Sequence, residues 1–215
     1  MPRNKYPEET VQKILDVSLK LFLEKGYEET TVLDIVDNLE GLTRGAFYHH
    51  FKSKEEVLDA LGIKLFWEDN PFEKVMSEIG LNGLEKIKKA IKLSFQNEKQ
   101  QKVNIMTMSL LKNPRILAEY LESNQDIVSP FFEKLFQEAI ADGSISDIKY
   151  PKALSSFFNL FTNMWLQPAI FPSSKQEILE RLYFMKDLLN DIGIPVFDDE
   201  ILDYIKKTLE DIVTE

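Results

Sequence analysis

The chain has 215 residues, carries 26 Lys and Arg against 36 Asp and Glu for a formal net charge of −10, and contains no cysteine. This acidic balance argues against a protein that coats nucleic acid without selectivity, and the lack of cysteine excludes a disulfide framework and thiol chemistry. The length allows one large or two small domains, and 15 Phe can build a substantial core.

The first predicted element is a long helix that begins near Pro7, because proline suits the first turn of a helix. Apolar residues recur at helical spacing over 11–22 and form one stripe. Lys25 followed by Gly26 is typical of a helix end. Charged residues precede the first apolar run, so we expect no signal peptide and a cytoplasmic protein.

Two short helices with a tight turn between them are predicted next. Thr31 and Asp34 form a capping box that starts the first short helix, and Gly41 breaks it. Thr43 can cap the second, and residues 53–56 form another capping box that starts a longer helix. The order of long helix, short helix, turn, short helix and long helix is that of a helix-turn-helix, whose second short helix enters the major groove of DNA.

Residues 43–54, called the basic island below, are the one stretch where cationic side chains, aromatic residues and helix signals coincide. The island holds Arg44, Lys52 and Lys54 together with both histidines of the chain, and it contains no Asp or Glu. A local cationic surface on an otherwise acidic chain indicates contact with a polyphosphate.

Residues 14–61 resemble the tetracycline-repressor-like (TetR) family of transcription regulators. The resemblance rests on residues 21–32, which read LFLEKGYEETTV, and above all on residues 41–56, which read GLTRGAFYHHFKSKEE. One departure is an additional residue between Ile35 and the turn glycine, which can lengthen the turn and leaves the end of the second helix open.

The resemblance implies an all-α protein in two domains. Residues 1–52 would form a three-helix DNA-binding domain, with the helix-turn-helix at about 31–50. Residues 53–215 would form a helical domain that binds a small-molecule effector and dimerises.

With this resemblance, we expect DNA contacts from nine residues: Thr31, Thr43, Arg44, Gly45, Ala46, Tyr48, His49, Lys52 and Lys54. Phe47 and Phe51 are expected to anchor the short helix in the core, so that the side chains between them face outward. Arg44 has the length and fork to reach a guanine edge or phosphates, whereas the two lysines should touch phosphate only. The alternative for both lysines is an ordinary solvated side chain.

No metal site is expected at His49 and His50. Adjacent residues on a helix point about 100° apart, and there is no cysteine or third histidine to complete a ligand set.

The remaining two thirds of the chain is predicted to be helical, because proline and glycine positions separate segments with helical periodicity. The predicted helices lie near 84–98, 101–112, 115–123, 130–141, 151–167, 175–191 and 198–213. No alternating strand pattern, internal repeat or low-complexity stretch is found.

Residues 153–174 contain no charged side chain. Asparagines, a glutamine and two prolines interrupt the apolar run, which is too short for a membrane span. A helix that is uncharged all round is buried on more than one side, and the family resemblance implies dimerisation through 151–167 and 175–191. The expected interface residues are Phe157, Phe158, Asn159, Phe161, Asn163, Leu182 and Met185, with Asn159 and Asn163 facing outward. A purely internal core helix is the alternative.

Members of the family enclose a small-molecule site among their middle helices. The residues expected to line it here are Phe66, Trp67, Phe95, Met106, Met108, Phe132 and Trp165. Their aromatic and sulfur-containing side chains would suit an apolar or aromatic effector, although such residues at helical spacing can equally be plain core.

The implied function is a ligand-responsive repressor that binds a palindromic operator on double-stranded DNA as a homodimer. We expect no cofactor, no membrane contact and no enzymatic activity. The alternatives are a helical adaptor that uses the basic island to bind protein, or a helical enzyme that binds a small molecule but not DNA. Carboxylates are plentiful, but none pairs with a histidine or nucleophile in a recognisable pattern, and no glycine-rich phosphate loop occurs.

Overall fold

The computed structural model describes residues 7–213, and these residues form helices with no strand among them. The expected all-α fold is therefore confirmed. The chain forms two compact units, one built from residues up to Asp69 with Glu98–Thr107, and the other from Asn70–Asn97 with the residues from Met108 onward. The functional boundary expected at residue 52 stays a prediction.

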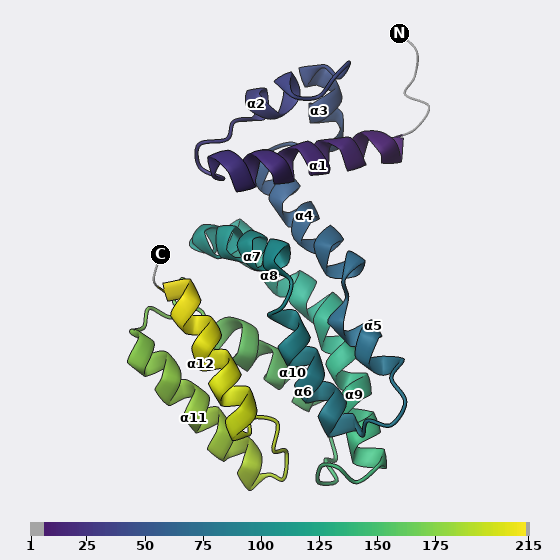
Figure 1. Cartoon of the computed structure of the whole chain (residues 1–215), viewed down its shortest axis with the longest axis vertical. Helices are drawn as coiled ribbons and strands as arrows, with labels where there is room; N and C mark the ends of the chain where they lie inside the picture. Colours follow the sequence, from purple (N-terminus) through teal and green to yellow (C-terminus); the bar gives the residue numbers. More distant parts are fainter. Residues whose placement is uncertain (1–6, 214–215) are drawn as a thin grey trace. The chain divides into compact units, whose positions relative to one another are not determined.

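The first unit contains the predicted helix-turn-helix (Figure 1). Its helices are α1 (Pro7–Lys25), α2 (Val32–Asp37), α3 (Arg44–His50), α4 (Lys54–Glu68) and the part of α7 (Glu98–Leu110) up to Thr107. The long α1 packs against both α2 and α4, and α2 packs against α3. The element order therefore matches the order read from the sequence.

The three predicted N-caps, Thr31, Thr43 and Ser53, start α2, α3 and α4. The Thr31 side chain accepts from the Asp34 amide in a complete capping box, and the Thr43 hydroxyl accepts from the Ala46 amide at 3.2 Å. Ser53 also caps α4, but the carboxylate of Glu56 accepts from the amide of Lys52 rather than closing a box on Ser53. The turn after α2 is long because α2 ends at Asp37, and Gly41 then turns the chain with φ of 74°.

The core of the first unit is aliphatic and aromatic. Its most buried members are Ile14, Phe22, Ile35, Phe47, Val57, Leu58, Leu61 and Val103. Val103 reaches the core from α7, where its side chain lies 3.9 Å from the position a Cβ would take on Gly62 of α4. A Cβ on Gly62 would therefore make only an ordinary van der Waals contact with Val103.

The second unit packs nine further helical segments and the end of α7. They are α5 (Pro71–Met76), α6 (Gly83–Ser94), α8 (Pro114–Ser123), η1 (Asn124–Val128), α9 (Ser129–Ala141), α10 (Pro151–Leu160), η2 (Phe161–Trp165), α11 (Lys175–Asp191) and α12 (Asp199–Val213). Helix α9 packs on both α6 and α10, and α11 lies beside α12 (Figure 1). A Cβ on Gly83 would lie 2.3 Å from the Ala139 amide nitrogen, so only glycine permits this approach of α6 to α9.

Aromatic rings form the centre of the second unit. Phe132 packs edge-on against Phe72 and against Phe158, with 4.9 Å between the ring centres in each pair. Phe158 also stacks on Phe197, with 5.9 Å between the ring centres. All four rings are buried. These contacts join α5, α9, α10 and the loop before α12 into one core.

Two features of this unit differ from the sequence-based expectation. Residues 71–76 lie outside the helices predicted from the sequence but form the short helix α5, because the Asn70 side chain accepts from the amides of Phe72 and Glu73. The helices predicted near 115–123 and 130–141 are not separated by a break, since the wide-turn segment η1 carries α8 directly into α9. A wide turn frees backbone groups from the usual spacing, so a proline near the start of α9 does not interrupt the helix.

Candidate nucleic-acid interface

Helix α3 presents one buried and one exposed face. Phe47 is 1% exposed and anchors the inner face, with Phe51 buried just beyond the helix end. Arg44 and Tyr48 are exposed, lie four residues apart on one side, and are in contact, with the guanidinium carbon 5.5 Å from the ring centre. The outward direction expected for the residues between the two phenylalanines is therefore confirmed for Tyr48 and His49, whereas His50 is half-buried.

The first turn of α3 leaves its backbone accessible. Gly45 is exposed, and a Cβ placed on it would meet only the Thr43 hydroxyl, at 3.7 Å. No neighbouring helix therefore needs a glycine at this position. What a glycine does provide is room for an external group to approach the backbone at the start of α3.

The exposed Thr31 caps α2. Its hydroxyl donates to the Asp34 carboxylate at 2.6 Å while its oxygen accepts from the Asp34 amide at 3.1 Å. The same carboxylate pairs with Lys25 at 2.9 Å. Hydrogen bonds from Thr31 and then from Lys25 hold the pKa of Asp34 well below its ordinary value.

Lys54 points into the first unit. Its ammonium donates to the backbone oxygens of Tyr27 at 2.9 Å, Thr30 at 3.2 Å and Glu28 at 3.3 Å. It also lies 4.2 Å from the centre of the Tyr27 ring. An ammonium has three N–H donors, and here each has a carbonyl partner, so the expected phosphate contact from Lys54 is not supported by its geometry.

The partners of Lys54 were missed from the sequence. Tyr27 is buried and donates its phenol hydrogen to the Glu55 carboxylate at 3.1 Å. Burial first, and Glu55 second, raise the pKa of Tyr27. No sequence signal links these residues, because they are separated by more than twenty positions and brought together by the packing of α1 on α4.

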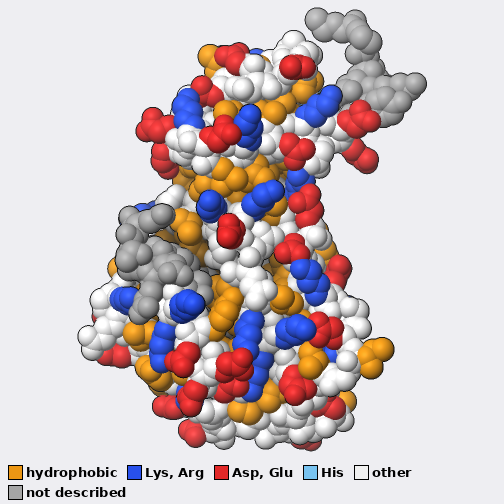
Figure 2. Space-filling view, viewed as in Figure 1, with side chains coloured by type: hydrophobic (Ala, Val, Ile, Leu, Met, Phe, Trp, Pro, Cys, Tyr) orange, Lys and Arg blue, Asp and Glu red, His pale blue; other side chains and the backbone are white. Residues whose placement is uncertain are grey.

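The cations of the basic island that face solvent are Arg44 and Lys52. Burial and the neighbouring His49 lower the pKa of His50, so His50 adds no charge at neutral pH. On the face shown in Figure 2, acidic and basic side chains are interspersed over much of the surface. The net charge of −10 gives the chain as a whole no attraction for DNA, so an attractive contact has to come from a local group of cations.

The residues expected at a subunit contact divide into two groups. Phe158, Asn159, Leu182 and Met185 are buried within their own chain, whereas Phe157 is exposed and Phe161 and Asn163 are half-buried. The expectation that Asn159 faces outward is wrong. Its amide nitrogen donates to the Asn124 carbonyl and the Ser129 hydroxyl, both at 2.8 Å, and so ties α10 to η1 and α9.

An exposed apolar strip borders these buried residues on α10, η2 and α11. It consists of Phe157, Leu160, Tyr183 and Phe184, with Phe161 and Trp165 beside them. The rings of Phe157 and Phe161 are 4.1 Å apart, and the rings of Trp165 and Phe184 are 5.9 Å apart. The sequence reading missed Leu160, Tyr183 and Phe184, because the 3.6-residue period predicts a face but not which neighbours cover it.

The residues expected to line an effector pocket fall in different parts of the chain. Phe66, Trp67 and Met106 belong to the first unit, whereas Phe95, Met108, Phe132 and Trp165 belong to the second. Phe132 is 5% exposed and packs inside the aromatic core, and its expected role in effector binding stays a prediction. Trp67 is exposed and packs edge-on against Phe66 at 5.4 Å.

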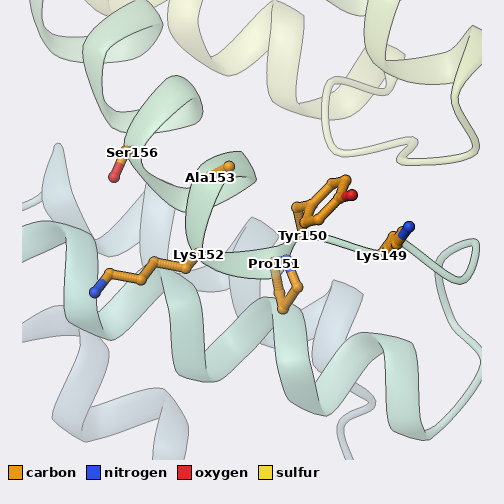
Figure 3. Close-up of a pocket in the computed structure, with 6 residues that line it drawn as sticks. All are labelled: Lys149, Tyr150, Pro151, Lys152, Ala153 and Ser156. Atoms are coloured by element: carbon orange, nitrogen blue, oxygen red, sulfur yellow. The ribbon is translucent and has the colours of Figure 1, made fainter.

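The described surface also has an open hollow at the start of α10, with a volume of about 500 Å³. Figure 3 shows its lining: Lys149, Tyr150, Pro151, Lys152, Ala153 and Ser156. None of the residues expected to bind an effector lines this hollow. Among residues 8–207, whose side chains the structure describes, there is no cluster of His, Cys, Asp and Glu that could hold a metal ion. No described helix is long and apolar enough to span a membrane.

Comparison with known proteins relates this chain to a family of regulatory proteins. Residues 14–61 match the family described as bacterial regulatory proteins, tetR family. The chain is 31% identical over 140 residues to the uncharacterized HTH-type transcriptional regulator YerO of Bacillus subtilis, an alignment that covers 61% of this chain and 46% of YerO. It is 26% identical over 144 residues to the HTH-type transcriptional repressor KstR2 of Mycolicibacterium smegmatis, covering 64% of this chain and 68% of KstR2. The chain thus spans less than half the length of the first of these relatives.

Two solved structures share the fold. A TetR-family transcriptional regulator from Pectobacterium atrosepticum superposes with a TM-score of 0.65 at 20% identity, covering 90% of this chain and 98% of that protein. GusR of Salmonella enterica superposes with a TM-score of 0.59 at 19% identity, covering 88% of this chain and all of the other. At such identities the likeness shows the fold alone.

Proposed function

Because this chain belongs to the TetR family of bacterial regulatory proteins, we propose that it is a sequence-specific DNA-binding transcriptional regulator. The observation that carries the proposal is α3, which is anchored by Phe47 and exposes Arg44, Tyr48 and His49 on its other side. A short helix with a guanidinium on its open face suits the major groove, where arginine can pair with a guanine edge. Thr43, Ala46 and Lys52 complete the proposed contact surface at the two ends of α3.

The most direct experiment is selection of duplex DNA from a random-sequence library by the full chain, followed by mobility-shift titration at several salt concentrations. Enrichment of one motif with salt-dependent affinity supports the proposal. A chain that enriches no motif, or binds all duplexes equally, refutes it.

We further propose that the protein acts as a homodimer through the exposed apolar strip on α10, η2 and α11. A single recognition helix buries too little surface for tight binding, and two helices related by a two-fold axis would read half-sites about 34–36 Å apart. An exposed apolar strip of this kind is typical of a subunit interface. Footprinting should then show a symmetric site, and protection of a single half-site would refute the dimeric mode.

An apolar or aromatic effector is the remaining part of the proposal, with repression relieved or altered when it binds. Trp67 is exposed, and Trp165 packs between Phe161 and Phe184, so the two tryptophans of the chain can report on such a ligand by fluorescence. A compound that changes tryptophan fluorescence should also change operator affinity, by roughly 5–150-fold for a typical coupling. We propose no enzymatic activity, and we place the protein's action in the cytoplasm, where it would meet its operator.

A further inference from the structure

We infer that Lys54 does not contact phosphate but is a positioning residue for DNA binding. It holds the turn after α1 against the start of α4 and thereby orients α3. This inference rests on the proposed function. It concerns three residues, Tyr27, Lys54 and Glu55, which are called the Tyr27 clamp below.

The first half of the clamp is the ammonium of Lys54. Its three carbonyl partners at 2.9–3.3 Å all lie in the turn between α1 and α2, and the face of the Tyr27 ring lies 4.2 Å away. Hydrogen bonds from an ionised donor are stronger than neutral ones, and a cation over an aromatic face adds further attraction. To reach a phosphate, Lys54 would have to give up all these contacts at once.

The second half is the neighbouring carboxylate. Glu55 accepts the phenol hydrogen of Tyr27 at 3.1 Å, while the Tyr27 ring packs edge-on against Phe22 of α1 at 5.1 Å. Thr30 closes the turn itself by donating to the Gly26 carbonyl at 2.7 Å. Two consecutive residues of α4 therefore hold the ring and the backbone of one turn.

The clamp acts on both short helices of the helix-turn-helix. The Thr30 carbonyl that Lys54 holds lies directly before Thr31, the N-cap of α2. Lys54 is also the first residue of α4, and only three residues separate it from the end of α3 at His50. A functional surface must be held within about 0.5 Å and 10–20° to be productive, so loosening the clamp should tilt α3 relative to α2.

Lys52 is the matched control. It lies two positions away in the same basic island, is exposed, and uses its backbone amide rather than its side chain to bind Glu56. If Lys52 contacts phosphate, the Lys52→Ala variant releases about one counterion fewer when it binds DNA. A lysine that only positions α3 releases no counterion, so its loss leaves the salt dependence unchanged.

The experiment measures affinity against salt concentration for the unaltered chain, Lys54→Ala, Lys54→Met and Lys52→Ala. Each is titrated with the duplex selected by the unaltered chain and with a scrambled duplex of equal length. Lys52→Ala should lower the salt slope by about one unit and weaken both duplexes by a similar factor. Both Lys54 variants should keep the slope, and they should weaken the selected duplex more than the scrambled one. Lys54→Met keeps an unbranched aliphatic side chain next to Tyr27, and it replaces Lys54→Ala in the comparison if Lys54→Ala loses helix content.

A Lys54 variant that behaves like Lys52→Ala, with a slope lower by about one unit and an unchanged ratio between duplexes, would overturn the inference. A second readout needs no DNA. Hydrogen exchange of the amides in residues 27–32 should be faster in Lys54→Met than in the unaltered chain, and equal exchange would also overturn it. If the unaltered chain selects no duplex, the proposed function fails and the DNA role of Lys54 fails with it, a result distinct from either outcome above.

Discussion

Asp34 shows how one residue at the protein surface can link two helices through several contacts. Its carboxylate accepts from the Thr31 amide at 2.7 Å and from the Thr31 hydroxyl at 2.6 Å, and it pairs with Lys25 at 2.9 Å. These contacts join the end of α1 to the beginning of α2, next to the turn that Lys54 holds. Because the ion pair with Lys25 needs the ionised carboxylate and the hydrogen bonds are stronger to it, the junction depends on pH.

We predict that Asp34 stabilises the fold at neutral pH and loses this effect in acid. Its pKa is lowered in the folded state, so its contribution is present above the ordinary Asp value of about 4 and fades as the pH falls towards the folded value. The thermal unfolding midpoints of the unaltered chain and Asp34→Asn should differ at pH 7, and the difference should shrink steadily as the pH is lowered below about 4. Asp37→Asn, on the exposed side of the same helix, is the control, and a difference that grows in acid would contradict the prediction.

Arg44 carries the second prediction at the residue scale. Arg44→Ala should weaken binding to the selected duplex by about 1–3 kcal/mol and relax the preference at one base position, because a bidentate contact to guanine is lost. Mobility-shift titration and a repeat of the selection measure the two effects. Arg115→Ala removes an exposed arginine of α8 in the other unit and should change neither. If Arg44→Ala selects the original motif with equal preference, Arg44 does not read a base.

At the scale of elements, the two wide-turn segments stand out because they meet at a polar network. Asn159 of α10 donates to the Asn124 carbonyl of η1, and its own oxygen accepts from the Asn163 amide of η2. The Ser155 hydroxyl donates to the Ser129 carbonyl in the same region. Polar side chains in the uncharged stretch 153–174 thus bind backbone carbonyls of η1 and α9 directly.

We predict that Asn159→Ala destabilises the second unit by roughly 1–3 kcal/mol, since it removes the hydrogen bonds that the buried Asn159 side chain makes to Asn124, Ser129 and Asn163. The measurement is urea unfolding followed by helical circular dichroism. Asn190→Ala, at an exposed position near the end of α11, should have little effect. Equal stability of the two variants would show that the Asn159 network contributes nothing net.

At the scale of the whole molecule, a chain with a net charge of −10 is proposed to bind a polyanion through a small basic island and a second copy of itself. Non-specific attraction is then weak, and affinity must come from correct geometry at two half-sites. Assembly is therefore expected to control DNA binding. A change in the second unit can test this relation.

We predict that Phe184→Asp gives a folded monomer that has lost most of its affinity for the selected duplex. The Phe184 side chain is 54% exposed, so a carboxylate there is solvated in one chain but would be buried without a partner in a dimer. Sedimentation and mobility-shift titration measure the two effects. Ile79→Asp, at a fully exposed position of the same unit, should leave both unchanged, and a dimeric Phe184→Asp variant would move the interface elsewhere.

The amino-acid sequence by itself determined the features that depend on neighbours within a few residues. Short-range hydrogen bonding explains the caps at Thr31, Thr43 and Ser53, and the helical period explains the inward side of α3. The absence of charge from 153–174 is read directly from the sequence. The family resemblance depends on the same local pattern.

Only the tertiary structure decided what distant segments do to one another. It directed Lys54 to carbonyls 24–27 positions away, turned Asn159 inward and carried α8 through η1 into α9. Both side chains look solvent-facing from periodicity alone, because a polar residue on a helix is read as outward unless its partner is known. The partner is set by which helices pack together, and that choice depends on the free energy of burying the whole core rather than on any local pattern.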